Sequence, residues 1–572
     1  MEVKHGLGYQ NYEDLMCNHI FYIDKTDFIK EWWDYADKVT LVTRPRRFGK
    51  TLNMSTVECF FSVQYEGRSD LFEGRKVWED ETLRGLQGTY PVIFLNFAGV
   101  KAQEMKTAMK SMIACTFKKF EYIMKSSLFQ DDDREYYASV KKEMTDETAV
   151  TAISMLSMYL EKYYHKKVII LLDEYDTPMQ EAWIYGYWEE AAAFLRSFFV
   201  NTFKTNDSME RGLITGITRI SKESIFSGLN HLEVVTTTSD KYAASFGFTE
   251  EEVFGALDAA GLGAHKEGVR KWYDGFTFGT CTDIYNPWSI ICFIGKRGAY
   301  AAYWANTSSN ELVSSLIQTG NAEVKKIVEE LLDGKSFVTP MDEQIVFQQL
   351  NGSTNAVWSL LLASGYLKIV GREPFGEDRT EYAKYTLALT NREVWFMLRN
   401  MVKDWFGKDD VPVYYNEFIN ALLHDNVRRM NTFMNKVALH TFSYFDTGNK
   451  PSEETHPERF YHGFVLGMIV NLSDRYQVTS NRESGYGRYD VMIEPFDKNE
   501  KAFIFEFKVL DTDDDERTLE DTVANALAQI EEKRYETALI ARGFAPGNIR
   551  KYGFGFQGQR CLIGESVSMP EI

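Results

Sequence analysis

Residues 38–51 read KVTLVTRPRRFGKT, and this stretch decides the fold of the first part of the chain. Its first six residues are typical of a buried strand, and a basic turn leads from them directly into a helical pattern. A phosphate-binding loop needs such a strand-to-helix turn, a lysine that reaches phosphate oxygens, and a Ser or Thr hydroxyl for Mg²⁺. Gly49, Lys50 and Thr51 supply the end of this motif, whereas Arg44 stands where the usual motif has glycine. The tripeptide alone is equally consistent with a surface turn.

A second apolar run, at residues 168–174 (VIILLDE), ends in two adjacent carboxylates. At the end of a buried strand, Asp173 would hold Mg²⁺ and Glu174 would polarise an attacking water. A core strand that simply ends in carboxylates is the alternative. Because both motifs occur in the expected order and each follows a predicted strand, we expect a nucleotide site here. Its predicted members are Arg46, Arg47, Phe48, Gly49, Lys50, Thr51 and Asp173.

Further strand-like runs at 92–97 and 213–217, separated by long helical patterns, predict a parallel sheet covered by helices. The second of these runs leads into Thr218 and Arg219. Thr218 would act as a polar sensor of the γ-phosphate and Arg219 or Arg211 as a charge stabiliser, although an ordinary polar strand end explains these residues at least equally well. The first domain is therefore expected to be an α/β P-loop NTPase domain over residues 1–250.

Residues 251–450 form mainly helical patterns with short strand-like pieces such as 366–370, which predicts a helical lid and a winged-helix-like region. A stretch rich in turn formers at 447–454 (TGNKPSEE) predicts a linker. A compact final domain is accordingly expected at 451–572.

The final domain contains two strand-like runs, 485–493 (GYGRYDVMI) and 502–508 (AFIFEFK). Side chains alternate along a strand, so Glu506 and Lys508 project to one face and the neighbouring phenylalanines to the other. If the runs pair as a hairpin, Asp490 approaches Glu506, and two carboxylates so placed can bind Mg²⁺. The ammonium of Lys508, beside these carboxylates, would orient water or stabilise the charge that develops on the phosphoryl group. A charged pair on an exposed strand face is the alternative.

The chain has 572 residues and a net charge of −19. This charge argues against a histone-like coating of nucleic acid but allows a local basic groove, for which the candidate pairs are 428–429, 533–534 and 550–551. Six cysteines without a C-x-x-C pair predict reduced thiols in a cytoplasmic protein. No apolar run approaches the roughly 20 residues of a membrane span, so no membrane partner is expected.

Together with 272–276 (WYDGF) and 285–289 (YNPWS), the motifs of the first domain resemble the bacterial AAA-ATPase-like family over about residues 5–300. In that family the form RPRRFGK[ST] takes the place of the glycine-led loop. The resemblance implies ATP and Mg²⁺ as ligands and an ATPase activity.

Residues from about 450 to 565 resemble the PD-(D/E)XK nuclease superfamily, which implies a restriction-endonuclease-like α/β fold. By position, Asp490 and Glu506 become metal ligands and Lys508 the catalytic lysine. Gln529 becomes the polar residue of the following helix. Glu458 is an additional candidate carboxylate.

These features predict an ATP-binding ATPase fused to a Mg²⁺-dependent nuclease, with Mn²⁺ as an alternative metal. Its partner is expected to be nucleic acid, DNA in preference to RNA, with the nucleotide state gating the nuclease and a homo-oligomer allowed. The alternative is a nucleotide-controlled oligomeric signalling or scaffold protein whose nuclease-like domain binds without cutting. The set Asp490, Glu506 and Lys508 favours the enzyme, and the glycine-poor loop favours the alternative.

Overall fold

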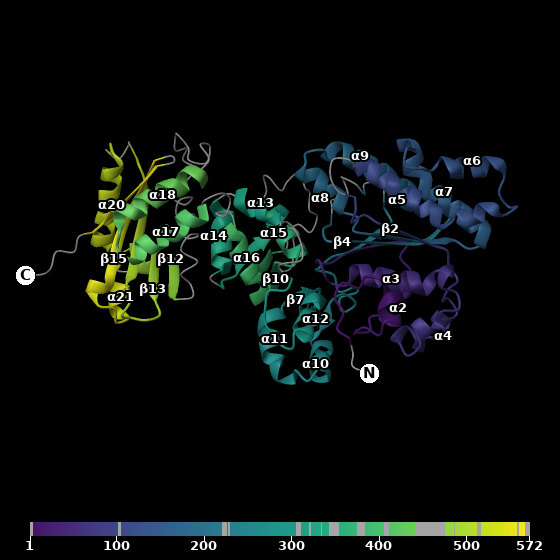
Figure 1. Ribbon diagram of the computed structural model, residues 1–572, viewed down its shortest axis with the longest axis horizontal. Helices are drawn as coiled ribbons and strands as arrows, with labels where there is room; N and C mark the ends of the chain where they lie inside the picture. Colours follow the sequence, from purple (N-terminus) through teal and green to yellow (C-terminus); the bar gives the residue numbers. More distant parts are fainter. Residues whose placement is uncertain are drawn as a thin grey trace, which may run out of the picture. The chain divides into compact units, whose positions relative to one another are not determined.

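The computed structural model of the chain divides into two compact units (Figure 1). One consists of Met1–Ile317 and Asp333–Met397, and the other of Gln318–Leu332 and Leu398–Ile572. Each has its own sheet and core, and each is described by itself. The structure describes residues 4–100, 105–219, 226, 229–304, 311–319, 322–332, 334–341, 354–373, 384–404, 411–441, 475–484, 487–511, 516–557 and 560–566.

The first unit is built on a five-stranded sheet with the strand order β2-β3-β4-β1-β5. All neighbouring strands are parallel, so their carboxyl ends meet at one edge, and the predicted parallel sheet is confirmed. The strands are β1 (Val39–Thr43), β2 (Val92–Asn96), β3 (Val168–Asp173), β4 (Met209–Gly216) and β5 (Leu232–Val235).

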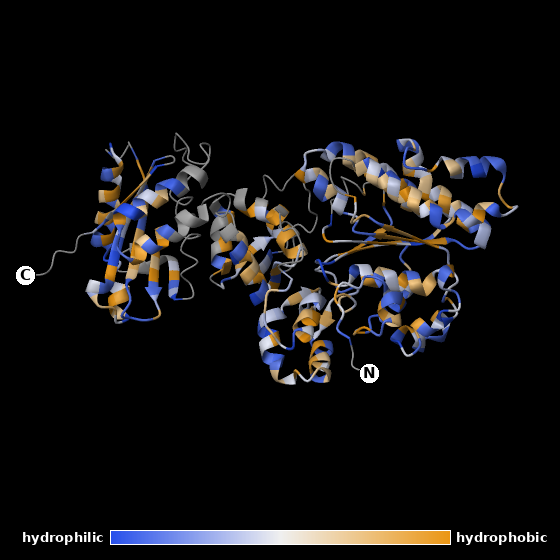
Figure 2. Ribbon diagram, in the orientation of Figure 1, coloured by the Kyte–Doolittle hydropathy of each residue, from blue (hydrophilic) through white to orange (hydrophobic). Residues whose placement is uncertain are grey.

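Helices cover both faces of this sheet. Figure 1 shows α2, α3 and α4 on one face and α5, α7 and α9 on the other. Every residue of β1 and β3 is buried as a result, which explains their unbroken apolar runs, and Figure 2 shows the central strands as hydrophobic. The helices are α1 (Tyr12–Cys17), α2 (Asp27–Tyr35), α3 (Lys50–Phe61), α4 (Glu81–Arg84), α5 (Met105–Lys119), α6 (Asp131–Ser139), α7 (Asp146–Tyr164), α8 (Thr177–Ile184) and α9 (Trp188–Phe199).

Residues 248–304, which we call the lid, combine a small antiparallel sheet of order β6-β8-β7 with three helices. Their aromatic side chains pack together, and Tyr273, Tyr285 and Phe293 are fully buried. The elements are β6 (Phe248–Thr249), α10 (Glu250–Ala259), α11 (Lys266–Tyr273), β7 (Phe276–Phe278), β8 (Cys281–Tyr285) and α12 (Pro287–Gly295).

A second antiparallel sheet of order β10-β11-β9 follows the lid. The buried carboxylate of Glu393 joins helix α16 to the lid. It accepts hydrogen bonds from Ser289 Oγ (2.8 Å) and from the backbone N–H of Trp304 (2.6 Å). The region predicted as mainly helical therefore also contains two small sheets. The elements after the lid are α13 (Glu311–Thr319), α14 (Ala322–Leu332), β9 (Phe337–Pro340), α15 (Thr354–Ala363), β10 (Leu367–Glu373), β11 (Lys384–Leu389) and α16 (Arg392–Asp404). Of these, α14 and the end of α16 belong to the second unit.

The second unit contains a five-stranded sheet of order β12-β13-β14-β15-β16. Only β14 and β15 run parallel among its neighbouring strands, and the hairpin expected between 493 and 502 is present as β13–β14. The confirmed fold class is thus a parallel NTPase-like sheet followed by a mixed C-terminal sheet. The elements are β12 (Tyr476–Ser484), β13 (Gly487–Pro495), β14 (Ala502–Val509), α20 (Leu519–Lys533), α21 (Thr537–Ala541), β15 (Ile549–Gln557) and β16 (Arg560–Glu565).

Two helices that precede this sheet in the chain, α17 (Val411–Leu423) and α18 (Val427–Thr441), cover one of its faces. Phe418, Leu422 and Met430 pack in one buried cluster with the side chains of that face. The opposite face packs against α20, whose Ile530 lies in a buried cluster with Met492 and Ile504 of the sheet. The core of the unit therefore begins before residue 451, and the three-part division at 250 and 450 stays a prediction. The expected linker at 447–454 and Glu458 lie outside the described residues.

Within the described part of the chain, no helix has both the length and the apolar character needed to cross a membrane.

Candidate nucleotide and metal sites

The loop between β1 and α3 contains two left-handed residues, a feature of turns that can bind anions. Arg47 and Gly49 both adopt left-handed backbone conformations, with φ of 68° and 82°. Backbone N–H groups in such a turn can point into one concavity, and the first N–H groups of α3 add to the same positive field. An arginine in the left-handed region carries backbone strain, which is typical of a functional loop. The turn predicted from Gly49-Lys50-Thr51 is thus a strand-to-helix loop at the carboxyl edge of the sheet.

The lysine of the motif lies across this loop. Lys50 is only 4% exposed, and its Nζ donates to the carbonyl oxygens of Arg44 and Pro45, each at 3.1 Å. Its charge is therefore held at the loop that would receive phosphate oxygens.

Asp173 is the centre of a polar cluster formed by the ends of several strands. Its Oδ2 accepts a hydrogen bond from Thr51 Oγ1 (2.7 Å) and another from Asn96 Nδ2 (3.3 Å). Its Oδ1 accepts from the hydroxyl of Thr215 and from the backbone N–H of Glu174. Burial, and next the charge of Glu174, raise the pKa of Asp173.

The predicted pair Thr51 and Asp173 is thus brought together, and a hydroxyl beside a carboxylate suits Mg²⁺, which prefers oxygen ligands. Asn96 and Thr215 were not anticipated from the sequence, although both stand at strand ends and Thr215 belongs to the run that leads to Thr218. Glu174 follows Asp173 directly, is half-buried and has φ of 56°.

Thr218 contacts a different carboxylate. Its backbone N–H (2.9 Å) and its hydroxyl (2.8 Å) both donate to Oδ2 of Asp176. Asp176 is fully buried, and this burial raises its pKa. The hydroxyl of Thr218 therefore fastens the end of β4 to Asp176, while Thr215 contacts Asp173.

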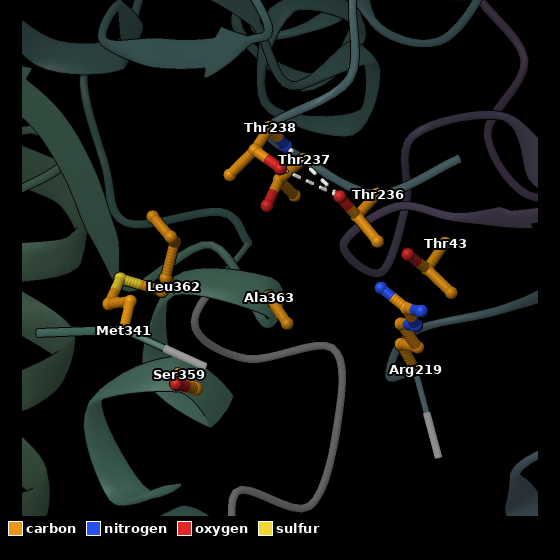
Figure 3. A pocket seen from close by; sticks show the side chains of 9 residues that line it. All are labelled: Thr43, Arg219, Thr236, Thr237, Thr238, Met341, Ser359, Leu362 and Ala363. Atoms are coloured by element: carbon orange, nitrogen blue, oxygen red, sulfur yellow. Dashed lines mark hydrogen bonds between the residues drawn. The ribbon is translucent and has the colours of Figure 1, made fainter. Parts of the chain in front are cut away.

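Arg219 lines a small cavity at the carboxyl edge of the same sheet (Figure 3). Thr43 and Thr236 lie on the sheet side of this cavity, and α15 contributes Ser359 and Leu362. Its lining is completed by Thr237, Thr238, Met341 and Ala363.

The other loop side chains expected at the nucleotide contact the lid. The guanidinium of Arg47 lies 4.3 Å from the ring centre of Trp288, and the ring of Phe48 lies 4.7 Å from that of Phe276. The carbonyl of Arg46 accepts a hydrogen bond from Asn286 Nδ2 (3.3 Å). The side chains of Arg47 and Phe48 and the backbone carbonyl of Arg46 therefore connect the loop to the lid.

In the second unit, the predicted metal-binding residues lie on one face of the sheet. Val491 is opposite Phe505 in the β13–β14 pair, and both pack against α17 and α18. Because side chains alternate, Asp490, Glu506 and Lys508 belong to the other face, toward α20. Asp490 Oδ2 accepts a hydrogen bond from the N–H of Phe507 (2.8 Å), the residue between the other two.

Gln529 of α20 completes the group, because its Nε2 donates to Oε1 of Glu506. The same amide lies 3.2 Å from the hydroxyl of Tyr535, a buried residue that the sequence reasoning missed and whose pKa is raised by burial. Glu506 is 3% exposed, and Lys508 is half-buried. Lys508 forms no hydrogen bond or ion pair with any residue that the structure describes.

Glycines in β15 allow α20 to approach this face. Gly553 and Gly555 stand beside Glu506 and Lys508 in the parallel β14–β15 pair. A Cβ on Gly553 would lie only 3.0 Å from the carbonyl oxygen of Val523 in α20. The close packing of α20 on the sheet is what lets Gln529 reach Glu506.

The donor set is small. Among the described residues, no group of three or more His, Cys, Asp or Glu side chains is arranged to hold a metal. Asp490 and Glu506 are the two carboxylates that the sequence predicted for this face, and water would supply further ligands to a hard cation such as Mg²⁺.

The candidate basic pairs of the second unit are largely engaged by acidic neighbours. Arg550 Nε bonds to Asp425 at 2.9 Å, and Lys551 Nζ bonds to Glu531 at 2.8 Å. Arg429 lies 3.6 Å from Glu417. These side chains hold the unit together, so they add less to a nucleic-acid groove than their charge suggests.

Comparison with known proteins supports both domain resemblances. Residues 6–226 match the family model described as "Predicted AAA-ATPase", and residues 456–566 match that of the PD-(D/E)XK nuclease superfamily. Both resemblances are thus confirmed: the chain joins an AAA-ATPase-like domain to a domain of the PD-(D/E)XK nuclease superfamily.

Similar proteins extend over much of the chain. An "uncharacterized protein in vnfD 5'region" of Azotobacter chroococcum mcd 1 is 24% identical over 545 residues, which cover 91% of each chain. Among solved structures, the Walker-type ATPase PABY2304 of Pyrococcus abyssi matches with 13% identity and a TM-score of 0.35. That match covers 69% of this chain and 99% of the other.

Proposed function

We propose that the chain is a divalent-metal-dependent nuclease whose activity is controlled by ATP bound at the loop 44–51. The observation that carries the nuclease half is the convergence of two carboxylates and a half-buried lysine on the α20 face. Asp490 contacts the backbone beside Glu506, and Lys508 lies on the same strand with no partner among the described residues. A cation without a neutralising neighbour is available to a phosphate.

Each residue has a separate role in this proposal. Asp490 and Glu506 would hold Mg²⁺ or Mn²⁺, which supplies a Lewis acid and lowers the pKa of bound water. Lys508 would stabilise negative charge on the phosphodiester oxygens during attack. Gln529 would keep the carboxylate of Glu506 oriented through the hydrogen bond to its Oε1. The substrate would be nucleic acid, DNA in preference to RNA.

At the other site, the loop N–H groups and Lys50 would bind the phosphates of ATP. Thr51 and Asp173 would hold the accompanying Mg²⁺, and Glu174 would polarise a water for hydrolysis. Thr218 would sense the γ-phosphate, and Arg219 would stabilise the charge that develops there. Control of the nuclease by the nucleotide is supported by the presence of both domains in one chain and by a relative that aligns across both.

The test is cleavage of linear and circular DNA and of RNA by the purified protein with Mg²⁺ or Mn²⁺, in the presence and absence of ATP. We expect metal-dependent cleavage that is lost in Asp490→Ala and Lys508→Ala. Lys551→Ala is the matched control, because this lysine belongs to the same sheet but is paired with Glu531. Cleavage that survives both active-site changes would refute the assignment.

The alternative, a nucleotide-controlled oligomeric scaffold, gives a different result in the same experiment. It is favoured by the small donor set, since the described residues hold no group of three or more metal-binding side chains of the His, Cys, Asp and Glu types. A scaffold would retain DNA in a gel-shift assay without cutting it under any metal, and its assembly state would change with ATP.

A further inference from the structure

Arg44 occupies the position of the first glycine of a phosphate loop, yet its side chain does not extend into the loop. The guanidinium is fully buried against the segment 236–242, which connects β5 to the lid. Its Nη1 donates to the carbonyl oxygens of Thr43 (3.0 Å) and Thr236 (2.6 Å). Its Nη2 donates to those of Lys241 (3.3 Å) and Tyr242 (3.5 Å).

The same guanidinium packs on the lid itself. It lies 4.4 Å from the ring centre of Phe278 in β7 and 5.8 Å from that of Phe246. No carboxylate pairs with it among the residues that the structure describes. Burial alone lowers the pKa of Arg44 to about 9. A buried cation of this kind is unfavourable unless hydrogen bonds and ring faces compensate it, and here carbonyl oxygens and two aromatic rings do so.

The backbone of Arg44 reaches the nucleotide site at the same time. Its N–H donates to the carbonyl of Gly216 at the end of β4 (3.1 Å), and its carbonyl accepts from Lys50 Nζ (3.1 Å). One residue therefore contacts the lid with its side chain and the phosphate-binding lysine with its backbone. Phe48 of the same loop provides a second link to the lid, because its ring centre lies 4.7 Å from that of Phe276 and 5.5 Å from that of Phe278.

We propose that Arg44 is a positioning residue that fixes the phosphate loop against the lid, so that nucleotide affinity depends on the lid contacts of this arginine. The inference rests on the proposed binding of ATP and deepens it by naming the lid as a determinant of affinity. It predicts that restoring the usual glycine weakens the site. Lysine also fails, because an ammonium cannot donate to both groups of carbonyls while stacking on Phe278.

The experiment is calorimetric titration of the full-length protein with ATP and Mg²⁺. We expect Arg44→Gly and Arg44→Lys to weaken ATP binding at least tenfold. Phe278→Leu leaves the loop sequence intact and should weaken binding about threefold, so the inference can be tested even if the arginine variants fold poorly. Methylguanidinium should restore part of the ATP affinity of Arg44→Ala, whereas methylammonium at the same concentration should not.

Arg211→Ala is the matched control. Arg211 also donates to backbone carbonyls, of Trp32 (3.1 Å) and Trp33 (2.6 Å), and its guanidinium lies 4.0 Å from the ring centre of Trp33. It stands near the amino-terminal end of β4, away from the loop, so its loss should lower the melting temperature without changing ATP affinity. ATP binding by Arg44→Gly and Phe278→Leu as tight as in the parent protein overturns the inference alone. A parent protein that does not bind ATP overturns both the inference and the proposed nucleotide function.

Discussion

The two candidate sites use different geometric means to bring distant residues together. At the nucleotide site, the carboxyl ends of parallel strands place Thr51, Asn96 and Thr215 around Asp173, and each of them already bonds to this carboxylate. At the nuclease-like site, side-chain alternation places Glu506 and Lys508 on one face, and Lys508 bonds to nothing within the described residues. The first site is a connected polar network, whereas the second keeps a cation available. The comparison shows that both sites hold their carboxylates through hydrogen bonds, and that they differ in the lysine, which is bonded within the loop at the first site and has no partner among the described residues at the second.

The largest expected effect is the loss of cleavage when Lys508 of the nuclease-like site is replaced. Lys508→Ala should lower the cleavage rate at least 100-fold, about the loss that follows removal of one stabiliser of transition-state charge. Single-turnover cleavage of labelled DNA in Mg²⁺ measures it. Lys551→Ala, whose lysine is already paired with Glu531, should cleave within about twofold of the parent under the same conditions.

The next effect concerns the core of the second unit. Leu422→Ala in α17 removes a fully buried side chain that packs on the sheet, and should destabilise this unit by about 2–5 kcal/mol. In calorimetric unfolding of the full chain, one transition should move to lower temperature while that of the first unit stays in place. A shift of the first unit's transition alone would show that α17 does not belong to the second core.

The stability of the first unit is expected to depend on pH through Glu393. Burial raises the pKa of Glu393 from 4.5 to about 7. The folded state therefore binds this proton more tightly than the unfolded state, so the first unit loses stability as the pH rises from about 4.5 to 7, by at most about 3 kcal/mol. Glu393→Gln should flatten the dependence of the first unit's melting temperature on pH across that window. An unchanged pH dependence would show that Glu393 is not its source.

The smallest expected effect tests the role of Lys50 at the nucleotide site. Lys50→Ala should weaken ATP binding at least tenfold, a cost of about 1.4 kcal/mol, because it removes a phosphate contact. Lys38→Ala is the control, since Lys38 Nζ also bonds to backbone carbonyls, those of Met209 and Glu210, but precedes β1 at the other edge of the sheet. If calorimetry gives equal ATP affinities for Lys50→Ala and the parent protein, the loop is an ordinary turn and does not bind phosphate through Lys50.

The sequence predicted those parts that depend on one strand and its neighbourhood. Apolar runs followed by Gly49-Lys50-Thr51 and by Asp173 define strand ends, and parallel strands bring such ends to one edge. Alternation along β14 likewise placed Glu506 and Lys508 on one face. The roles assigned to these residues remain predictions, because geometry alone does not measure binding or turnover.

The missed features depend on contacts between segments far apart in the chain. Nothing in the loop sequence reveals that Arg44 is buried against the carbonyls of 236–242, or that Thr215 rather than Thr218 bonds to Asp173. The apolar pattern of α17 predicts a buried face, but it does not say which sheet covers that face. These contacts form only in the tertiary structure, and the local sequence pattern around each residue carries no information about them.

The most direct measurement for the central claim is a crystal structure of the protein soaked with Mn²⁺, read from the anomalous signal of the metal. We expect a peak within coordination distance, roughly 2.0–2.3 Å, of carboxylate oxygens from both Asp490 and Glu506, and no peak in Asp490→Asn. A fully occupied peak elsewhere on the second unit, with the α20 face empty of metal, would contradict it.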